Sequence, residues 1–575
     1  MDMTQIHRLP LGINDFPELR EGNYYYVDKT AYIEAMERTS RFLFFTRPRR
    51  FGKSLFISMI KEYYDIKAQS KFDALFHDTW IAEHPTAERG SFQVLHFDFS
   101  LVGGDFSDVA ERFNAYCGIE LDRFIRKYAS DYGKDIVDSV FAADNASDKL
   151  NIIGGAAEDI GKRLYIIVDE YDNFTNNILN TRGEPDYRAI THGTGFYRNF
   201  LKIFKAKASR ALLLGVSPVT LDDLTSGANN FTNITSDPEF NMALGFSEDD
   251  VRRMIRYYQE VGKISRDVEA IVAEMKPWYD NYCFAADSLD KEPKMFNPDM
   301  VLYFLGHLIK NGRSPNSMLD PNTKTDYEKM RRLVGLDRMD GNRKGIIRDI
   351  VEEGCLYATI RESFPAEDVI KPDTFPSLLF YYGMLTIGGV AGDQLKLVIP
   401  NQNVRVQYYN YLLEQYQEVI DLNIQWLSTA LRKAACDGEW QPLMNGLAEH
   451  YREDSSLRDT IGGEKNLQGY MNAYLHVSRL FIAIPEQEMN HGYCDFFLFG
   501  DWKRYPDVRH SYIIELKYLR RDATESEKES QWQAGLEQLR RYGEDARVRQ
   551  LAENTTLHLV ILQMRGAELV RLEEV

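Results

Sequence analysis

The sequence predicts an α/β chain in which two sheet-containing domains flank a mainly helical region. Three observations support this fold class: apolar runs that end in polar loops, helical periodicity through the middle, and two strand-like runs near the carboxyl end. Short continuous apolar runs are typical of parallel strands that are buried on both faces. At 575 residues the chain exceeds the size at which a single core stops growing, so several domains are expected. We predict their boundaries at residues 1–245, 246–455 and 456–575.

The first apolar run, Phe42–Phe45, leads through a short basic loop into a segment with helical character. A strand, a loop and a helix that begins with Gly-Lys-Ser form the layout of a nucleotide-binding P-loop. Gly52 would let the backbone approach phosphate oxygens, Lys53 would reach the β- and γ-phosphates, and the Ser54 hydroxyl would ligate Mg²⁺. Arg47 stands where the common pattern has its first glycine, so the alternative is a basic loop with a chance Gly-Lys-Ser.

A second apolar run, Leu164–Val168, ends in the acids Asp169 and Glu170. Ligands of open α/β sheets bind beyond the carboxyl ends of the strands, where these two carboxylates would lie. We expect Asp169 to hold the Mg²⁺ shell and Glu170 to polarise the attacking water. The alternative for an isolated Asp-Glu pair is a solvated turn, and its position behind a P-loop candidate favours the catalytic interpretation.

A third run, Ala211–Val216, has the composition of another core strand. Ser217 or Thr220 at its polar end could sense the γ-phosphate, and a plain loop is the alternative. Together these segments predict a set of nucleotide-contacting residues: Arg49, Arg50, Phe51, Gly52, Lys53, Ser54, Leu55 and Asp169.

The middle region has the periodicity of amphipathic helices and no catalytic pattern. Ser247, three residues before Asp250, predicts a helix start. Helices are predicted around residues 249–258, 301–308, 327–333 and 404–419. We interpret this region as a lid or wing of the first domain, with partner binding as an elaboration.

Near the carboxyl end, Gly492–Phe499 and Ser511–Tyr518 predict two strands joined by a polar turn. Residues two apart in a strand point to the same face, so Glu515 and Lys517 would project together, and a hairpin would bring Asp495 beside them. Two carboxylates can hold a divalent cation, and a nearby ammonium can orient water or stabilise a charged phosphate. The alternative is that Glu-x-Lys forms only a surface ion pair.

Several short motifs accompany these runs, at residues 12–16, 26–30, 47–55, 169–172, 215–218, 238–240, 245–247, 278–280, 296–298 and 399–401. In this order they resemble the AAA-ATPase-like proteins that are often fused to a PD-(D/E)XK nuclease-like domain. The resemblance implies a P-loop NTPase domain with a parallel sheet, a restriction-endonuclease-like domain with a mixed sheet, and ATP with Mg²⁺ or Mn²⁺ as cofactors. The loop Arg-Pro-Arg-Arg-Phe-Gly-Lys-Ser is itself characteristic of that family, so the missing first glycine no longer argues against nucleotide binding.

The resemblance also implies roles for residues around the second site. Glu464, on a helix-like run, would be a further metal ligand, and Gln538 and Tyr542 match the helix that follows the core. The chain departs from the family at Tyr493-Cys494, where an arginine that could contact phosphate is absent, and at Asn173-Phe174 and Asn281. The predicted metal ligands are Ser54, Asp169, Glu464, Asp495 and Glu515, and the predicted catalytic residues are Glu170, Asp495, Glu515 and Lys517.

Composition is consistent with a cytoplasmic protein. The 5 cysteines are scattered without a Cys-x-x-Cys pair, which indicates a reducing compartment. The amino terminus lacks an apolar signal core, and no apolar run is long enough to span a bilayer. The net charge of −18 shows no overall basic surplus of the kind that non-specific DNA binders have. It indicates either weak constitutive DNA binding or a substrate delivered by a partner or by oligomerisation. A local basic stripe could still form from Arg520-Arg521, Arg540-Arg541, Arg547 and Arg549, and solvated helix faces are the alternative.

Three functional hypotheses follow. The favoured one is an ATPase coupled to a metal-dependent nuclease that acts on nucleic acid, DNA in preference to RNA, with no membrane partner and with a homo-oligomer as one possible assembly. The second is a signalling or switch NTPase whose carboxyl-terminal domain binds nucleic acid or a partner without cutting. The third is an interaction protein with a degenerate ATP site, against which the presence of Lys53, Asp169 and Glu170 argues.

Overall fold

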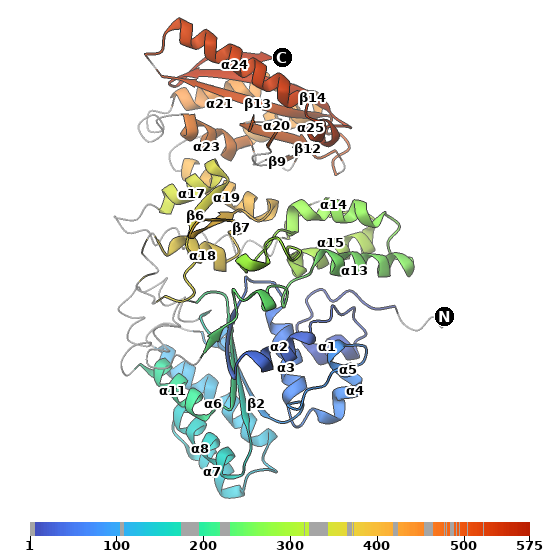
Figure 1. The fold of residues 1–575 in the computed structure, drawn as a ribbon, viewed down its shortest axis with the longest axis vertical. Coiled ribbons are helices and arrows are strands. Elements are labelled where there is room, and N and C mark those ends of the chain that lie inside the picture. Colours follow the sequence, from blue (N-terminus) through green and yellow to red (C-terminus); the bar gives the residue numbers. More distant parts are fainter. Residues whose placement is uncertain are drawn as a thin grey trace. The chain divides into compact units, whose positions relative to one another are not determined.

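The computed structural model has two compact units, each with its own five-stranded sheet (Figure 1). The first unit comprises Met1–Arg343 and Tyr357–Pro400, and the second comprises Lys344–Leu356 and Asn401–Val575. The boundaries predicted at 245 and 455 fall within these units and stay predictions. The described residues are 6–103, 108–173, 195–218, 231–315, 317–320, 343–364, 368, 371, 373–417, 424–453, 464–475, 478, 480–483, 488–489, 492–493, 495–502, 504–520 and 522–575.

The sheet of the first unit is entirely parallel, as the buried apolar runs predict. Its strand order is β2-β3-β4-β1-β5, so β4 lies between the strand that precedes the basic loop and the strand that ends in the two acids. The strands are β1 (Phe42–Thr46), β2 (Gln93–Asp98), β3 (Leu164–Asp169), β4 (Arg210–Gly215) and β5 (Thr232–Asn233). Thr46 is in register with Gly215, and Asp98 with Asp169, so the carboxyl ends of these strands form one edge of the sheet.

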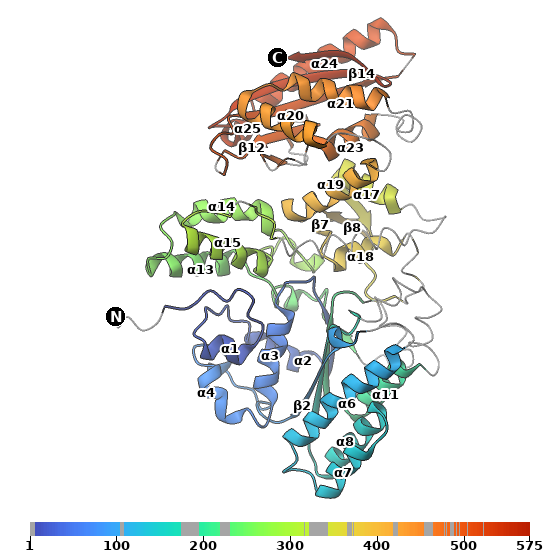
Figure 2. The same cartoon turned by 180° about the vertical axis from the view of Figure 1, so that it is seen from behind.

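Helices cover both faces of this sheet. Figures 1 and 2 show α1, α3 and α4 on one side and α6, α8 and α11 on the other. The helices are α1 (Phe16–Glu21), α2 (Ala31–Thr39), α3 (Lys53–Tyr64), α4 (Phe72–Leu75), α5 (Trp80–Glu83), α6 (Val109–Lys127), α7 (Lys134–Ala142), α8 (Ala146–Asp159) and α11 (Phe196–Lys207). This three-layer arrangement buries the sheet, which explains why β1, β3 and β4 carry apolar residues at nearly every position.

A bundle of three helices follows the sheet: α13 (Glu248–Glu260), α14 (Val268–Tyr279) and α15 (Pro298–Asn311). The predicted start of α13 is confirmed, since Ser247 and Asp250 form a reciprocal capping box. The apolar faces of the three helices share one core, against which Leu9, Tyr25 and Val27 also pack. The amino-terminal segment therefore joins the bundle to the sheet within this unit.

Of the two remaining helices predicted in the middle region, the structure describes one. The helix predicted at 404–419 is α19 (Gln402–Gln417), whereas the one predicted at 327–333 lies outside the described residues. The other elements here are α17 (Arg343–Glu353), β6 (Cys355–Ala358), α18 (Phe375–Tyr381) and the antiparallel pair β7 (Thr386–Ala391) and β8 (Gln394–Val398). In the part of the chain that the structure describes, no helix combines the length and apolar character needed to cross a bilayer.

The second unit has a mixed sheet in the order β15-β14-β13-β12-β9, as the resemblance implies. Only the β13–β14 pair is parallel, and the other three pairs are antiparallel. The strands are β9 (Phe481–Ala483), β12 (Phe496–Gly500), β13 (His510–Leu519), β14 (Thr556–Arg565) and β15 (Glu568–Glu574), with the separate pair β10 (Glu488–Met489) and β11 (Gly492–Tyr493). Together with the parallel sheet of the first unit, this confirms the predicted α/β fold class.

Helices cover both faces of this second sheet as well. Figures 1 and 2 show α24 on one face and α20, α21 and α23 on the other. Their bounds are α20 (Ile424–Asp437), α21 (Gln441–Glu453), α23 (Glu464–Leu475), α24 (Glu525–Gly543) and α25 (Ala546–Leu551). The strand predicted at 492–499 is divided into β11 and β12, with Asp495 at the bend between them.

Close packing of α24 on β13 depends on Gly535. A Cβ at this position would lie 2.6 Å from Ile561 Cδ1 and 3.0 Å from Lys517 Cε. We expect Gly535→Ala to lower the free energy of unfolding by up to about 2 kcal/mol, because the overpacking of the helix–sheet contact, about 1–3 kcal/mol, exceeds the gain of up to about 1 kcal/mol from alanine in a helix. Gly118→Ala in α6 is the matched control, since nothing lies within 4 Å of its Cβ position and alanine favours a helix by up to about 1 kcal/mol. Thermal and urea unfolding of both variants would test this, and equal stability of the two would contradict it.

Candidate functional site

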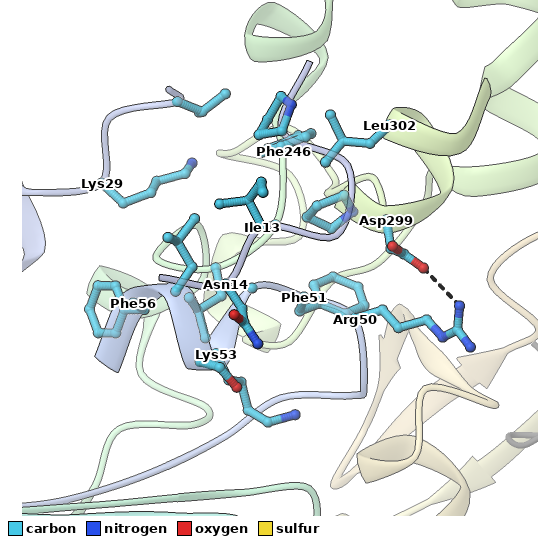
Figure 3. A pocket seen from close by; sticks show the side chains of 18 of the residues that line it. Ile13, Asn14, Lys29, Arg50, Phe51, Lys53, Phe56, Phe246, Asp299 and Leu302 are labelled. Carbon is cyan, nitrogen blue, oxygen red and sulfur yellow. Dashed lines mark hydrogen bonds and ion pairs between the residues drawn. The ribbon is translucent and has the colours of Figure 1, made fainter. Parts of the chain in front are cut away.

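The basic loop between β1 and α3 has the backbone geometry that phosphate binding requires. Gly52, the residue before α3, has φ 91°, a left-handed conformation that suits glycine, and Arg50 also lies in this region with φ 68°. Lys53 is therefore the first residue of α3, and the unpaired amide groups of the helix start face the loop. A cavity of about 370 Å³ opens against this loop (Figure 3).

The predicted magnesium ligands of the first unit lie in direct contact. The Ser54 hydroxyl donates a hydrogen bond to Asp169 Oδ2 at 3.0 Å, which joins the start of α3 to the end of β3. The Lys53 ammonium donates to the carbonyl oxygens of Arg47 and Pro48 at 3.1 and 3.2 Å and lies 3.8 Å from Glu170 Oε1. Burial, reinforced by the neighbouring Glu170 carboxylate, raises the pKa of Asp169 to about 6.

The three arginines of the loop have different surroundings. Arg47 is buried, and its guanidinium donates to the carbonyls of Thr46, Thr235 and Phe240 at 2.8–2.9 Å while lying over two aromatic rings. Its side chain thus points away from the cavity, which explains how the loop accommodates an arginine in place of the first glycine. Burial lowers the pKa of Arg47 to about 9.

Arg50 and Arg49 both line the cavity but differ in their partners. Arg50 donates to Asp299 Oδ2 at 2.7 Å, at the start of α15, and lies 3.5 Å from Asp320 (Figure 3). For Arg49 the structure gives no hydrogen bond or ion pair to any described residue, and the residue is half-buried. Of the two, Arg49 is therefore the more available to an anionic ligand.

The far end of the cavity is apolar and is formed by segments that precede and follow the sheet. Figure 3 shows Ile13, Phe246 and Leu302 grouped on one side of the cavity and Lys53 on the other. Of the remaining predicted contact residues, Leu55 and Phe51 both line the cavity, and the Phe51 ring also packs edge-on against the rings of Tyr282 and Phe284. The cavity therefore combines a cationic end for phosphates with an apolar end suited to a base.

Ser217, considered as a γ-phosphate sensor, is fully buried. Its hydroxyl donates to Asp172 at 3.0 Å, and it is absent from the residues that line the cavity. Thr220, the other candidate at this strand end, lies outside the described residues.

The residues of the second predicted site lie on β13 and on the elements beside it. Lys517 donates to Glu515 Oε1 at 2.6 Å and to Gln538 of α24 at 3.2 Å, so the same-face prediction for Glu515 and Lys517 is confirmed. The Asp495 carboxylate accepts the Leu516 amide at 2.7 Å, just beyond the last β12–β13 pair. Asp495 therefore reaches β13 through its side chain where the ladder of the two strands ends.

Two amide side chains complete this second cluster. Gln468 of α23 donates to Asp495 at 2.5 Å, and Gln538 donates to the Tyr542 hydroxyl at 2.5 Å. Glu464, the predicted further ligand, begins α23, but its side chain lies outside the described residues. Among the side chains that are described, no group of three or more His, Cys, Asp or Glu residues is arranged to hold a metal ion.

Sequence reasoning missed several residues of these sites. Asp299 follows a helix-start signal, Asn297-Pro298, but nothing in the sequence indicates that it meets Arg50. Gln468 lies one turn after Glu464, and this helical spacing was the only available signal that it shares a face with the predicted ligand.

The raised pKa of Asp169 generates a pH prediction for metal-assisted nucleotide binding. With a pKa of about 6 rather than 3.8, this carboxylate loses its charge as the pH falls through 6, two units earlier than an ordinary aspartate. We expect the gain in ATP affinity on adding Mg²⁺ to fall about fourfold between pH 7.5 and pH 5.5. Calorimetric titration with and without Mg²⁺ would measure this, and Asp169→Asn, which cannot titrate, should show no such change. A constant gain over this range would contradict the assignment.

Two segments of the chain match sequence models of known families. Residues 10–225 match the family described as "Predicted AAA-ATPase", and residues 462–574 match the "PD-(D/E)XK nuclease superfamily". A relative from Azotobacter chroococcum mcd 1, described as an uncharacterized protein in the vnfD 5' region, is 26% identical over 422 residues, which cover 71% of this chain and 70% of the relative. The chain therefore contains one segment similar to AAA-ATPase-like domains and a second segment similar to domains of the PD-(D/E)XK nuclease superfamily.

Proposed function

We propose that this protein binds and hydrolyses ATP in the cavity of the first unit and that this activity controls metal-dependent cleavage of DNA by the second unit. The observation that carries the proposal is the Ser54–Asp169 hydrogen bond beside the Lys53 ammonium. A hydroxyl and a carboxylate in contact at the start of a helix are the oxygen donors that Mg²⁺ takes in a nucleotide site. We further propose a cytoplasmic location and leave open the formation of a homo-oligomer.

The residues of the first site would have separate roles in binding and hydrolysing ATP. The loop amides and Lys53 would hold the β- and γ-phosphates, and Arg49 would add a positive charge from the same loop. Ser54 and Asp169 would hold Mg²⁺, which supplies neutralisation of the phosphate charge when bound. Glu170, at the edge of the cavity, would orient the attacking water and accept its proton. The apolar group around Ile13 and Phe246 would receive the base.

The residues of the second site would act on a phosphodiester. The Asp495 and Glu515 carboxylates would hold Mg²⁺ or Mn²⁺, with Glu464 as a third ligand, and the cation supplies an activated water when bound. Lys517 would orient that water or stabilise the charge that develops on the phosphate. Gln538 would keep the Lys517 ammonium beside the Glu515 carboxylate. Gln468 keeps the Asp495 carboxylate at the end of the β12–β13 ladder.

The net charge of −18 favours a second candidate function. A non-specific nuclease gains most of its affinity by neutralising phosphates with basic side chains. In this sequence basic residues do not outnumber acidic ones. A switch NTPase whose second unit binds nucleic acid or a partner without cutting would not need that affinity. The cleavage experiment below separates the two candidates.

The direct test is cleavage of plasmid and single-stranded DNA by the purified full-length chain with Mg²⁺ or Mn²⁺, with and without ATP. We expect Lys517→Ala to abolish metal-dependent cutting, because it removes the cation nearest to the carboxylates. We expect Lys53→Ala to lower ATP turnover by about 100-fold or more and to remove the effect of ATP on cutting, since it removes the charge at the phosphate end of the cavity.

Two lysines serve as matched controls in this experiment. Lys67→Ala in the first unit and Lys433→Ala in the second remove side chains whose ammonium groups, among the described residues, bond to Ser130 and to Glu439 respectively. Neither substitution should change either activity. Cutting that survives Lys517→Ala would refute the assigned nuclease site. ATP turnover without cutting under any condition would favour the switch NTPase. A wild-type protein that neither binds nor hydrolyses ATP would refute the whole proposal.

A further inference from the structure

We propose that Asp172 is a positioning residue that holds Glu170 in the orientation required for ATP hydrolysis, by anchoring the turn after β3 to the end of β4. This inference rests on the proposed ATPase function. It adds a role to a carboxylate that does not line the cavity and is 1% exposed.

The turn that carries Glu170 has a backbone conformation that needs external support. Glu170 has φ 50°, in the left-handed region that residues with a side chain adopt only at an energetic cost. Such conformations persist where the surrounding structure fixes them, and they occur often at active sites. The Glu170 side chain lies at the cavity edge, 3.8 Å from the Lys53 ammonium, so its direction depends on this strained backbone.

The Asp172 side chain connects this turn to the end of the neighbouring strand. Its carboxylate accepts the Val216 amide at 3.2 Å and both the amide and the hydroxyl of Ser217 at 3.0 Å. Asp172 is 1% exposed and Ser217 is fully buried, so these hydrogen bonds form without competition from water. Three donors among the described residues converge on one carboxylate, an arrangement that fixes its direction.

The backbone and the packing around this connection leave little freedom for the turn. The Tyr171 amide donates to the Leu214 carbonyl at 3.1 Å, and the Tyr197 hydroxyl donates to the Tyr171 carbonyl at 2.8 Å. A Cβ on Gly215 would lie 2.5 Å from the Tyr171 ring and 2.6 Å from Asp172 Oδ1, so the turn packs directly on the β4 backbone. The residue after this glycine is the first of the two whose amides bond to Asp172. Displacement of the carboxylate would therefore shift Glu170, two residues away.

The experiment uses Asp172→Asn in the full-length chain. Asparagine keeps the size of the side chain but replaces one acceptor oxygen by an amino group, which would face an N–H or O–H donor on β4. We expect the dissociation constant for Mg·ATP to stay within about threefold of the wild type, because the phosphate loop is untouched. We expect kcat for ATP hydrolysis to fall about 10- to 100-fold, since a small displacement of the water-orienting carboxylate is costly.

A double mutant separates positioning from a general loss of structure. If Asp172 acts through Glu170, then adding Asp172→Asn to Glu170→Gln should cause no further loss of kcat. Asp131→Asn, whose carboxylate accepts a hydrogen bond from Gln93 elsewhere in the same unit, is the matched control and should leave kcat unchanged. Ser217→Ala removes only the hydroxyl donor and should lower kcat less than Asp172→Asn does. If Asp172→Asn fails to fold, the kcat of Ser217→Ala tests the positioning role instead.

Each remaining outcome bears on one of the two proposals. Wild-type protein without ATP turnover would refute the proposed function. If wild-type turnover depends on Glu170 but Asp172→Asn keeps kcat within twofold of the wild type, the positioning role alone is overturned. Where Asp172→Asn does not fold, the same result in Ser217→Ala overturns it. An equal loss of affinity and kcat in the single variant, or additive losses in the double mutant, would also overturn it.

Discussion

Two consecutive carbonyl groups at the end of β4 hold both halves of the proposed nucleotide site. The Leu214 carbonyl accepts the Tyr171 amide at 3.1 Å, and the Gly215 carbonyl accepts the Arg47 amide at 3.3 Å. Because β4 lies between β1 and β3, the phosphate loop and the acidic turn are each an extension of the same parallel ladder. This constraint brings Ser54 to Asp169. The spacing of the strands in the sheet therefore sets the distance between the basic loop and the acidic turn.

The phosphate loop is also held by segments that follow the sheet. Arg47 donates to carbonyls at Thr235 and Phe240, and Arg50 pairs with Asp299 at the start of α15. Burial of the Arg47 guanidinium opposes its charge, and three carbonyl acceptors and two aromatic faces offset that cost. The conformation of the loop therefore depends on residues well beyond the segment that matches the ATPase family, which ends at residue 225. Nucleotide bound there would contact a cavity wall that includes the helical bundle.

Local sequence was sufficient for much of this structure and insufficient for its long-range contacts. Gly52 could be placed at the start of a helix, and Glu515 and Lys517 on one strand face, because helix signals and strand alternation act over a few residues. Arg47 looked like a defect in the motif, because its acceptors lie 188 and 193 residues away. Asp299 is separated from Arg50 by 249 residues, and no periodicity reports such a contact. Within the strand predicted at 492–499, the bond from the Leu516 amide of β13 to the Asp495 side chain was also unpredictable, since it joins residues 21 positions apart.

The central claim is that Ser54 and Asp169 act together on one magnesium–nucleotide complex. A double-mutant cycle with Ser54→Ala and Asp169→Asn, read out as the Mg²⁺-dependent part of ATP affinity in calorimetric titrations, tests this claim most directly. The account predicts strong coupling: either single variant removes most of the Mg²⁺-dependent gain, and the double variant loses little more. Independent, additive losses, or a gain from Mg²⁺ that survives in both single variants, would contradict a shared site.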